Sequence, residues 1–320
     1  MIIVSEFIAD PGPAMLQASG RENIIDPGLW QRRENLLQLL QSAEALIIRN
    51  QTKADEQLFS AAPRLKVLGR LGVGLDNIDL AAAAKHGVAV TSARNANAIA
   101  VAEYVFAAMT HFARPLYKMD GSVRAGGWER EIYTTVELAG KTLGLIGVGE
   151  IGRRVAARAK AFSMQVLAYD PFIGPYDAAV AEDHAELLSL EEVARRSDYL
   201  SVHTPLTAAT RHMINADILQ LVKPEAVLIN TSRGPVIDEA ALLAALQSEK
   251  LRGAALDVRE SEPPAMGDAL ANHPRVCSTP HIAGLTAEAQ ERTSLLVVAD
   301  VLRVLRGERA IGAVKLPVKQ

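Results

Sequence analysis

Three polar residues follow three separate apolar runs in the second half of the chain. Arg233 comes after residues 227–229, Glu262 after residues 254–256, and His281 after residues 276–280. An imidazole can accept a proton from an alcohol near neutral pH, and a carboxylate beside it holds its tautomer and favours its charged form. A guanidinium can bind a carboxylate with two hydrogen bonds and polarise a carbonyl oxygen. This set suits hydride transfer between a nicotinamide cofactor and a 2-hydroxy acid.

Each of these residues also has a simpler structural interpretation. His281 follows Pro280 and fits an ordinary loop histidine, Arg233 precedes Gly234 and fits a surface turn, and Glu262 precedes Pro263 and fits a solvated loop acid. Ligands of open α/β sheets bind beyond the carboxyl ends of the strands, so the joint pattern favours a shared site. That interpretation requires a dinucleotide fold around the three residues.

A glycine-rich turn supplies the signature of such a fold. Gly147, Gly149 and Gly152 follow the apolar run 143–146 and precede the helical stretch 153–160. In this arrangement the first glycine makes the tight turn, the second lets backbone approach a pyrophosphate, and the third allows close helix–strand packing. The helix N-terminus then binds the anion through its unpaired N–H groups.

An acidic residue ends the next apolar run. Asp170 follows residues 166–169, where a carboxylate can accept both ribose hydroxyls of NAD and repel the 2′-phosphate of NADP. No basic residue immediately follows Asp170, so we expect NAD rather than NADP. A further run is followed by His203, Thr204 and Pro205 on the expected cofactor side.

Short apolar runs that alternate with helical stretches must position these residues. This alternation predicts parallel sheets with crossover helices. Strands are expected at residues 2–4, 45–48, 66–68, 88–90, 142–146, 165–169, 199–202, 226–229, 254–256 and 276–278, and helices at residues 78–85, 97–112, 151–162, 190–196, 216–221, 239–248 and 287–305. About six of these strands fit a doubly wound nucleotide domain. We expect an α/β protein in which a Rossmann domain, residues 98–285, is inserted in a smaller flavodoxin-like substrate domain, residues 1–97 plus 286–320.

The composition of the chain limits the kinds of partner that the protein is expected to bind. The net charge is −3 and 49% of the 320 residues are hydrophobic, so no positive field favours a nucleic acid. No apolar run approaches the ~20 residues of a membrane span. The single cysteine, Cys277, excludes an intrachain disulfide, so we expect a cytoplasmic protein. Histidine and cysteine spacing predicts no metal site, and the histidines at 86, 111, 184, 212 and 273 are expected to be surface or structural residues without partners.

The motifs together resemble the D-isomer-specific 2-hydroxyacid dehydrogenase family over nearly the whole chain. They are GRLGVGLDNIDL at 69–80, GKTLGLIGVGEIGRRVA at 140–156, VHTPLTAATRHMIN at 202–215, NTSRGPVIDEAAL at 230–242, AALDVRESEPP at 254–264 and TPHIAGLT at 279–286. The resemblance implies that Arg233, Glu262 and His281 are catalytic, and that the protein forms a homodimer through its nucleotide domain. Besides the three glycines, the cofactor contacts it implies are Val73, Glu150, Ile151, Asp170, His203, Thr204, Pro205, Thr210, Thr231, Ser232, Arg233, Asp257, His281, Ala283 and Gly284.

Within the family, the chain resembles phosphoglycerate dehydrogenases. That similarity implies substrate contacts at Arg49, Arg70, Leu71, Gly72, Val73, Gly74, Arg130, Arg233 and His281. The chain has Arg49-Asn50 where phosphoglycerate dehydrogenases typically have Arg-Ser, and its Arg49–Thr52 segment resembles that of sulfolactate dehydrogenases. A 2-hydroxy acid with an anionic 3-substituent, of the 3-phosphoglycerate or 3-sulfolactate type, is therefore the expected substrate. Because the sequence ends at Gln320, no serine-sensing regulatory domain is expected.

Two alternatives stay open from the sequence. A broad glyoxylate and hydroxypyruvate reductase would differ from the expected enzyme only in its substrate pocket. Some family relatives are NADH-sensing corepressors that bind peptides while they retain the fold and even the catalytic residues. A role of Arg49 and Arg70 in binding an anionic substrate tail would argue against the broad reductase. Tight NADH binding without turnover would favour the corepressor.

Overall fold

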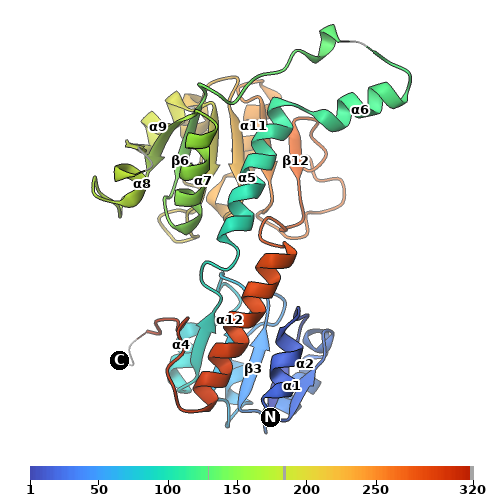
Figure 1. The fold of residues 1–320 in the computed structure, drawn as a ribbon, viewed down its shortest axis with the longest axis vertical. Helices are drawn as coiled ribbons and strands as arrows, with labels where there is room; N and C mark the ends of the chain where they lie inside the picture. The colour runs from blue at the N-terminus through green and yellow to red at the C-terminus, as the bar shows by residue number, and fades with distance from the viewer. Residues whose placement is uncertain (129, 183–184, 318–320) are drawn as a thin grey trace. The chain divides into compact units, whose positions relative to one another are not determined.

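The computed structural model describes residues 1–128, 130–182 and 185–317 (Figure 1). The chain divides into two compact units, which we call unit 1 (Met1–Asn97 with Leu285–Gln320) and unit 2 (Ala98–Gly284). Each unit is built around one sheet whose strands all pair in parallel. The predicted α/β class is confirmed.

Unit 1 contains a five-stranded sheet in the order β2-β1-β3-β4-β5. This is the flavodoxin-like order, in which both faces must be covered by helices. The strands are β1 (Ile2–Val4), β2 (Asn23–Ile25), β3 (Ala45–Ile48), β4 (Val67–Arg70) and β5 (Ala89–Ser92). One core contains residues of α1 (Gly12–Ala18) and α12 (Ala287–Leu305). The other contains residues of the 3₁₀ turn η1 (Leu29–Gln31), α2 (Arg33–Leu40), α3 (Glu56–Ser60) and α4 (Leu80–Lys85).

The last helix, α12, completes unit 1 by packing directly on β4. A Cβ added at Gly69 would lie 2.7 Å from Val297 and 2.8 Å from Val301, so only glycine allows this approach. On the same helix the buried Asp300 accepts a hydrogen bond from the Thr91 hydroxyl at 2.7 Å. It also accepts hydrogen bonds from backbone N–H groups of the segment that follows α12. That segment then pairs with the edge strand β5, where the Val314 N–H donates to the Val90 carbonyl.

Unit 2 contains a seven-stranded sheet in the order β12-β11-β10-β9-β6-β7-β8. Its strands are β6 (Thr142–Ile146), β7 (Gln165–Tyr169), β8 (Glu186–Leu187), β9 (Tyr199–Val202), β10 (Val227–Asn230), β11 (Gly253–Leu256) and β12 (Val276–Ser278). The first strand, β6, pairs with both β7 and β9, so the strand order reverses beside it. Crevices at such reversals bind the ligands of doubly wound sheets.

Helices cover both faces of the unit 2 sheet. One core contains residues of α5 (Ala98–Ala113) and α7 (Glu150–Ala161), and the other contains residues of α9 (Leu190–Arg196), α10 (Ala216–Leu221) and α11 (Glu239–Gln247). Many helices of the two units begin where a side chain caps the first turn, because that side chain accepts an otherwise unpaired N–H. The capping residues are Asp55, Asp79, Ser189, Asn215, Asp238 and Thr286.

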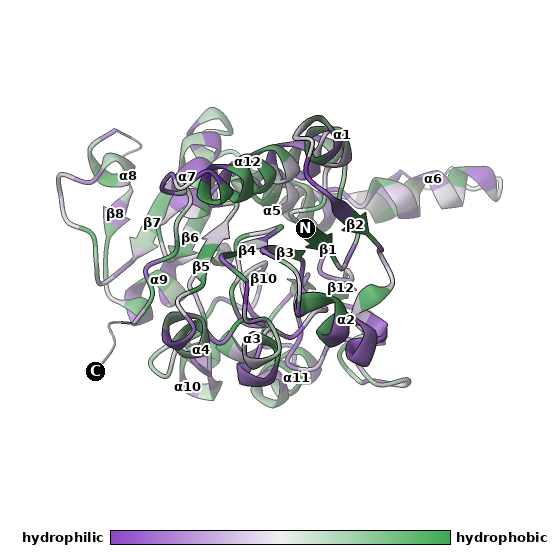
Figure 2. Cartoon of the chain, turned by 90° about the horizontal axis from the view of Figure 1, so that it is seen from below, coloured by the Kyte–Doolittle hydropathy of each residue, from purple (hydrophilic) through white to green (hydrophobic). Residues whose placement is uncertain are grey.

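One helix of unit 2 leaves the body of that unit. Helix α6 (Leu116–Arg124) projects away from the sheet in both views (Figures 1 and 2) and has no buried residue. The chain continues through the short 3₁₀ turn η2 (Glu131–Tyr133) before it returns to β6. We call residues 116–128 and 130–132 the arm.

Most predicted strands and helices occur within one or two residues of their expected ends. The estimate of six strands for the nucleotide domain was one too low, because β8 has two residues and its sequence carries no apolar run. Strand β2 and the helices α1, α2, α3, α6 and α8 (Ala178–Ala181) were also missed. Throughout the part of the chain that the structure describes, every helix is too short or too polar to span a membrane.

Candidate active site

A histidine–carboxylate pair lies at the carboxyl edge of the unit 2 sheet. The His281 Nδ1 atom is 2.8 Å from Glu262 Oε2, and the Arg259 backbone N–H donates to Glu262 Oε1 at 3.0 Å. Burial by itself raises the pKa of Glu262. The hydrogen bonds from His281 and from the Arg259 N–H, with the charges of His281 and Arg233, outweigh burial and lower this pKa. Glu262 is therefore ionised at neutral pH and can hold the imidazole while Nε2 stays available.

A buried carboxylate shapes the loop that carries His281. Asp257, at the end of β11, is 2% exposed. Its carboxylate accepts hydrogen bonds from the Thr279 hydroxyl at 2.6 Å and from the N–H groups of Ile282 and Ala283, both at 2.8 Å. Inside this loop His281 has a φ of 56°, a left-handed conformation that non-glycine residues adopt rarely. Backbone strain of this kind persists only where the surroundings impose it, and here Asp257 supplies the restraint.

The third predicted residue, Arg233, lies on the neighbouring loop after β10. Asn230 fixes this loop, because its Nδ2 donates to the Arg233 carbonyl at 3.0 Å and its Oδ1 accepts the Ser232 N–H at 3.0 Å. A Cβ added at Gly234 would lie 1.9 Å from the carbonyl carbon and oxygen of Arg259, so the two loops are in backbone contact. The structure thus brings Arg233, Glu262 and His281 together from three adjacent strand ends.

The glycine turn has the geometry expected from its spacing. Gly147 has a φ of 92°, which favours glycine. A Cβ at Gly152 would lie 2.4 Å from the Gly147 carbonyl oxygen, whereas a Cβ at Gly149 would meet no protein atom within 4 Å. Asp170, at the end of β7, accepts the N–H groups of Val148 at 2.8 Å and Phe172 at 2.9 Å. The Asp170 carboxylate is therefore hydrogen-bonded directly to the glycine turn.

Polar atoms without protein partners lie at the ends of β9 and β10. Among the described residues, His203 Nδ1, Thr204 Oγ1 and Thr231 Oγ1 are buried and accept or donate no hydrogen bond. Burial lowers the pKa of His203 to about 4, so its ring is neutral at pH 7. Backbone of His203 lies against the glycine turn, since a Cβ at Gly147 would be 3.0 Å from the His203 carbonyl carbon. Unsatisfied buried polar groups require an explanation, such as a bound ligand.

In unit 1 the predicted residue Arg49 follows β3 and belongs to a rigid loop. The carboxylate of Glu6, only 3% exposed, accepts the N–H groups of Arg49, Gln51 and Thr52 at 2.8–3.0 Å. The Asn77 amide donates to the carbonyls of Arg49 and Thr52. Sequence analysis missed Glu6, although it also follows an apolar strand.

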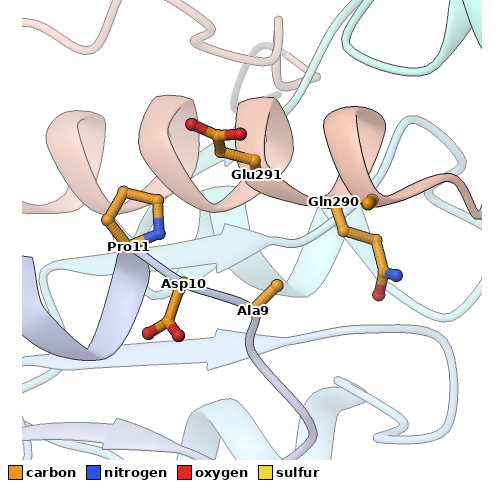
Figure 3. Close-up of a pocket in the computed structure, with 6 residues that line it drawn as sticks. Ala9, Asp10, Pro11, Gln290 and Glu291 are labelled. Carbon is orange, nitrogen blue, oxygen red and sulfur yellow. The ribbon is translucent and has the colours of Figure 1, made fainter.

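The Arg49 side chain is half-buried and held from two sides. Its Nη1 donates to Gln290 Oε1 at 3.3 Å, and its guanidinium carbon lies 5.8 Å from the centre of the Phe7 ring. Burial lowers the pKa of Arg49, and the Glu6 carboxylate acts in the opposite direction. Gln290 also lines a pocket of unit 1 between the start of α12 and the loop after β1 (Figure 3). Arg49 is thus pre-positioned at a strand end.

The remaining predicted substrate contacts lie in two places. Arg70 ends β4 and leads into the Leu71–Gly74 turn, in which Arg70 Nη1 donates to the Leu71 carbonyl at 2.9 Å and Val73 is 42% exposed. Arg130 lies on the exposed arm of unit 2. The structure therefore groups Arg49 with the Arg70 turn in unit 1 and places Arg130 in the other unit.

Comparison with known proteins identifies the family. The family model described as "D-isomer specific 2-hydroxyacid dehydrogenase, NAD binding domain" matches residues 106–283. The chain is 41% identical over 310 residues to the (S)-sulfolactate dehydrogenase of Chromohalobacter salexigens, which covers 97% of this chain and 99% of that protein. The chain belongs to the D-isomer-specific 2-hydroxyacid dehydrogenase family.

Two further relatives show the extent of the match. A D-3-phosphoglycerate dehydrogenase of Methanocaldococcus jannaschii is 41% identical over 316 residues, which cover 99% of this chain and 59% of the relative. The chain thus spans about three-fifths of that relative's length. The crystal structure of the TT0316 protein of Thermus thermophilus is 33% identical and superimposes with a TM-score of 0.90 over 98% of this chain and 99% of that one. The prediction from the motifs is confirmed at the level of the family.

The residues of unit 2 fit the dinucleotide that names the family's domain. The matched range contains the glycine turn, Asp170 and the side-chain atoms of His203, Thr204 and Thr231 that lack protein partners. The open space in front of Gly149 leaves room for backbone to approach a ligand. Hydroxyl and imidazole groups beside a helix N-terminus suit a ligand rich in hydroxyl and phosphate oxygens.

The prediction that the other histidines lack partners was wrong for four of them. His273 Nδ1 accepts the Arg275 N–H at 3.3 Å, and the His111 ring stacks on Tyr117. His86 Nε2 lies 3.0 Å from Glu56, and His212 Nε2 lies 2.9 Å from Glu260. Neither carboxylate is close in sequence, so local spacing could not reveal these pairs. His184 lies outside the described residues.

We expect the substitution Gly152→Ala to weaken NADH binding about tenfold or more, because overpacking of this size costs about 1–3 kcal/mol. The added methyl group would lie 2.4 Å from the Gly147 carbonyl oxygen and would open the turn. Isothermal titration with NADH measures the effect. The control is Gly121→Ala on α6, where an added Cβ meets nothing within 4 Å. Equal affinity in both variants would contradict a cofactor role for the turn.

Proposed function

We propose that the protein transfers a hydride between a nicotinamide dinucleotide and a D-configured 2-hydroxy acid or its 2-oxo acid. The observation that carries this proposal is the hydrogen bond of 2.8 Å between His281 and Glu262 beside Arg233. Family membership supports the reaction class, since the matched domain is an NAD-binding domain of D-2-hydroxyacid dehydrogenases.

His281 acts as the acid–base group in this proposal. Its Nδ1–H donates to the Glu262 carboxylate, which leaves Nε2 to accept the hydroxyl proton of the substrate in the oxidation and to return it in the reduction. Glu262 holds that tautomer and stabilises the positive charge that the ring gains. The left-handed backbone at His281, imposed by Asp257, aims the ring out of the loop.

Arg233 binds the substrate carboxylate in this proposal. A guanidinium can make two parallel hydrogen bonds to a carboxylate and also polarise the reacting carbonyl, which fixes the carbon that exchanges the hydride. When bound, the nicotinamide cofactor would accept or supply that hydride. The backbone of the glycine turn would hold it. His203, Thr204 and Thr231 would contribute their side-chain atoms that lack protein partners.

We propose NAD rather than NADP as the cofactor. The Asp170 carboxylate is fixed by the N–H groups of Val148 and Phe172 at the end of β7. A fixed negative charge at this position of a doubly wound sheet accepts ribose hydroxyls and repels a 2′-phosphate. No arginine or lysine stands among the residues immediately after Asp170 to offset this repulsion.

We propose that the substrate carries an anionic group on carbon 3, as sulfolactate and phosphoglycerate do. Arg49 supports this choice, because Glu6, Gln290 and Phe7 hold its backbone and side chain before any ligand binds. A guanidinium that is already in place loses little conformational entropy when it binds an anion. Relatives named for both kinds of substrate are 41% identical to this chain.

Turnover tests the proposed reaction. We expect NADH oxidation, followed by absorbance, with one or more of sulfopyruvate, phosphohydroxypyruvate, hydroxypyruvate and glyoxylate, and lower kcat/KM with NADPH. The variant His281→Asn should lower kcat by about 10²–10⁴-fold while NADH affinity changes little, since only the proton transfer is lost. No turnover with any of the four, together with tight NADH binding, would favour a cofactor-sensing binding protein instead.

Replacing Arg49 tests the anionic tail. The variant Arg49→Ala should raise KM for sulfopyruvate or phosphohydroxypyruvate by about 10- to 100-fold, because a charge-assisted hydrogen bond of about 1.5–3 kcal/mol is lost. Glyoxylate has no tail, so its kcat/KM should stay within about twofold. Arg64→Ala, an exposed arginine in the same unit, is the control. Equal losses for tailed and tail-free substrates would favour the broad reductase.

We propose that the arm of unit 2 mediates a homodimer. Large apolar side chains on the arm are at least half exposed, namely Leu116, Tyr117, Val123, Trp128 and Ile132. Helix α6 projects from the unit 2 sheet and buries none of its residues, so Leu116, Tyr117 and Val123 on this helix lie outside the cores of unit 2 (Figure 1). Contiguous exposed apolar groups mark interaction sites, and a two-fold dimer buries the same patch on both copies.

Charge placed on the arm should dissociate this dimer. We expect sedimentation analysis to give a dimer for the wild type and a monomer for Leu116→Glu with Trp128→Glu, because two buried charges oppose association. Phe172→Glu is the matched control, since Phe172 is 94% exposed in unit 2 but lies outside the arm. A monomeric wild type, or an unchanged mass in the arm variant, would refute an arm-mediated dimer.

A further inference from the structure

Arg259 is a buried arginine two residues after Asp257, in the loop that follows β11. It is 6% exposed, although it lies in a polar stretch of the sequence, Arg259-Glu260-Ser261-Glu262. Arginine is almost never buried to this degree unless it is paired. Its pairing partners therefore indicate what the side chain does.

Two carboxylates from different segments clamp the guanidinium. Arg259 Nε and Nη2 donate to the two oxygens of Glu239 at 2.8 and 2.9 Å, and Nη2 also donates to Asp268 Oδ1 at 2.9 Å. Asp268 is itself fixed, because the same oxygen accepts the Ala271 N–H at 2.7 Å. A planar fork that binds one carboxylate through two parallel hydrogen bonds has a defined orientation.

The backbone of Arg259 contacts the proposed proton-transfer pair. Its N–H donates to Glu262 Oε1 at 3.0 Å, and the other oxygen of Glu262 lies 2.8 Å from His281 Nδ1. The side-chain clamp and the hydrogen bond to Glu262 thus belong to one residue. Restraining the side chain restrains the direction in which its N–H points.

The same clamp connects this loop to the loop of Arg233. Glu239 is the first residue of α11, the next α-helix after the Arg233 loop. Its Oε1 also accepts the Glu260 N–H at 2.8 Å. On the other side, Gly234 lies against the Arg259 carbonyl, so closely that no Cβ fits. The backbone of Arg259 therefore contacts Glu262 through its N–H and the Arg233 loop through its carbonyl. The proposed reaction needs Glu262 and Arg233 at a fixed separation.

We propose that Arg259 is a positioning residue for Glu262: the Glu239–Arg259–Asp268 clamp orients the Arg259 N–H, which holds Glu262 against His281 and beside Arg233. This inference rests on the proposed function for its effect on rate. Lysine cannot replace the clamp, because an ammonium group lacks the planar fork. An uncharged side chain leaves Glu239 and Asp268 without their cation.

Loss of the clamp has a defined effect on Glu262. The groups that face this carboxylate are the His281 ring, the Arg259 N–H and the Arg233 charge, and together they lower its pKa against the effect of burial. The ionised form is required to hold His281, so activity falls as the pH drops through this pKa. Weakening the N–H contact raises the pKa, and the acid limb of the rate profile moves to higher pH.

The experiment compares Arg259→Lys and Arg259→Met with the wild type, each alone and combined with Glu262→Gln. We expect kcat to fall about 10- to 100-fold in Arg259→Met, less in Arg259→Lys, with NADH affinity within twofold. The acid limb of kcat should move up by about one pH unit in the single variants. In the Glu262→Gln background the same substitutions should cost less than about twofold, because residues that act through one another are not additive.

A merely structural role predicts a different pattern. Equal losses of kcat in both backgrounds, or an unmoved acid limb, would overturn the proposal. If Arg259→Met fails to fold, as judged by circular dichroism, Glu239→Gln weakens the same clamp without changing Arg259, and it should move the acid limb in the same direction. Glu186→Gln is the matched control, because it weakens a two-bonded arginine pair with Arg196 elsewhere in unit 2 and should leave the profile unchanged.

A readout that needs no turnover separates this inference from the proposed reaction. The Nδ1–H proton of His281 can be observed by nuclear magnetic resonance and assigned by its loss in His281→Asn. We expect its signal to shift or broaden in Arg259→Lys and to stay unchanged in Glu186→Gln. A wild type that turns over no oxo acid but shows this shift would refute the proposed function alone, and an unshifted signal in a folded Arg259→Lys would refute the positioning role alone.

Discussion

In both units of this protein, the loops that follow the strands have backbone N–H groups that need hydrogen-bond acceptors, and the shapes of these loops depend on how these groups are satisfied. Every strand of an all-parallel sheet ends in a loop at the same edge, and the N–H groups of these loops are turned away from the ladder. Ionised carboxylates satisfy them, because one carboxylate can accept several N–H groups. At strand ends these carboxylates are Glu6, Asp170, Asp257 and Glu262, and Asp300 does the same for the segment that follows α12. Each of these acids shapes a loop, and the carboxylates of Glu6 and Glu262 also act on Arg49 and His281.

This arrangement explains why structural and chemical roles are difficult to separate in unit 2. Asp257 has both oxygens occupied by the loop after β12, so its contribution to the site is the shape of that loop. Glu262 divides its two oxygens between the backbone of Arg259 and the ring of His281. The oxygen bound to Arg259 fixes the position of the Glu262 carboxylate, and the other oxygen fixes the orientation of the His281 ring. A carboxylate that did only one of these could not orient the imidazole.

The features predicted from sequence were those whose signals are local. Apolar runs mark the strands of both sheets, and the spacing of Gly147, Gly149 and Gly152 marks the turn after β6, because sterics within a few residues decide both. Arg259 could not be found in this way. An arginine in a polar stretch predicts an exposed side chain, and the reasons for its burial, Glu239 and Asp268, lie 20 and 9 residues away. The pairs of His86 and His212 and the short strand β8 were missed for the same reason, since tertiary contacts produce them. The family's motifs point to Arg233, Glu262 and His281, which periodicity alone does not single out, but they carry no information on what holds Glu262 in place.

The packing of α12 on β4 affects how the chain acquires its structure during synthesis. Residues 98–284, which make up the whole of unit 2, leave the ribosome before residues 287–305 do, and domains generally fold as units while the chain grows. One face of the unit 1 sheet lacks its covering helix during that interval, because Val297, Val298 and Val301 belong to its core. The inserted unit can therefore complete its core while the first 97 residues still expose apolar strands. A nascent chain of this topology exposes apolar strands of unit 1 to aggregation and to chaperones until α12 has been made.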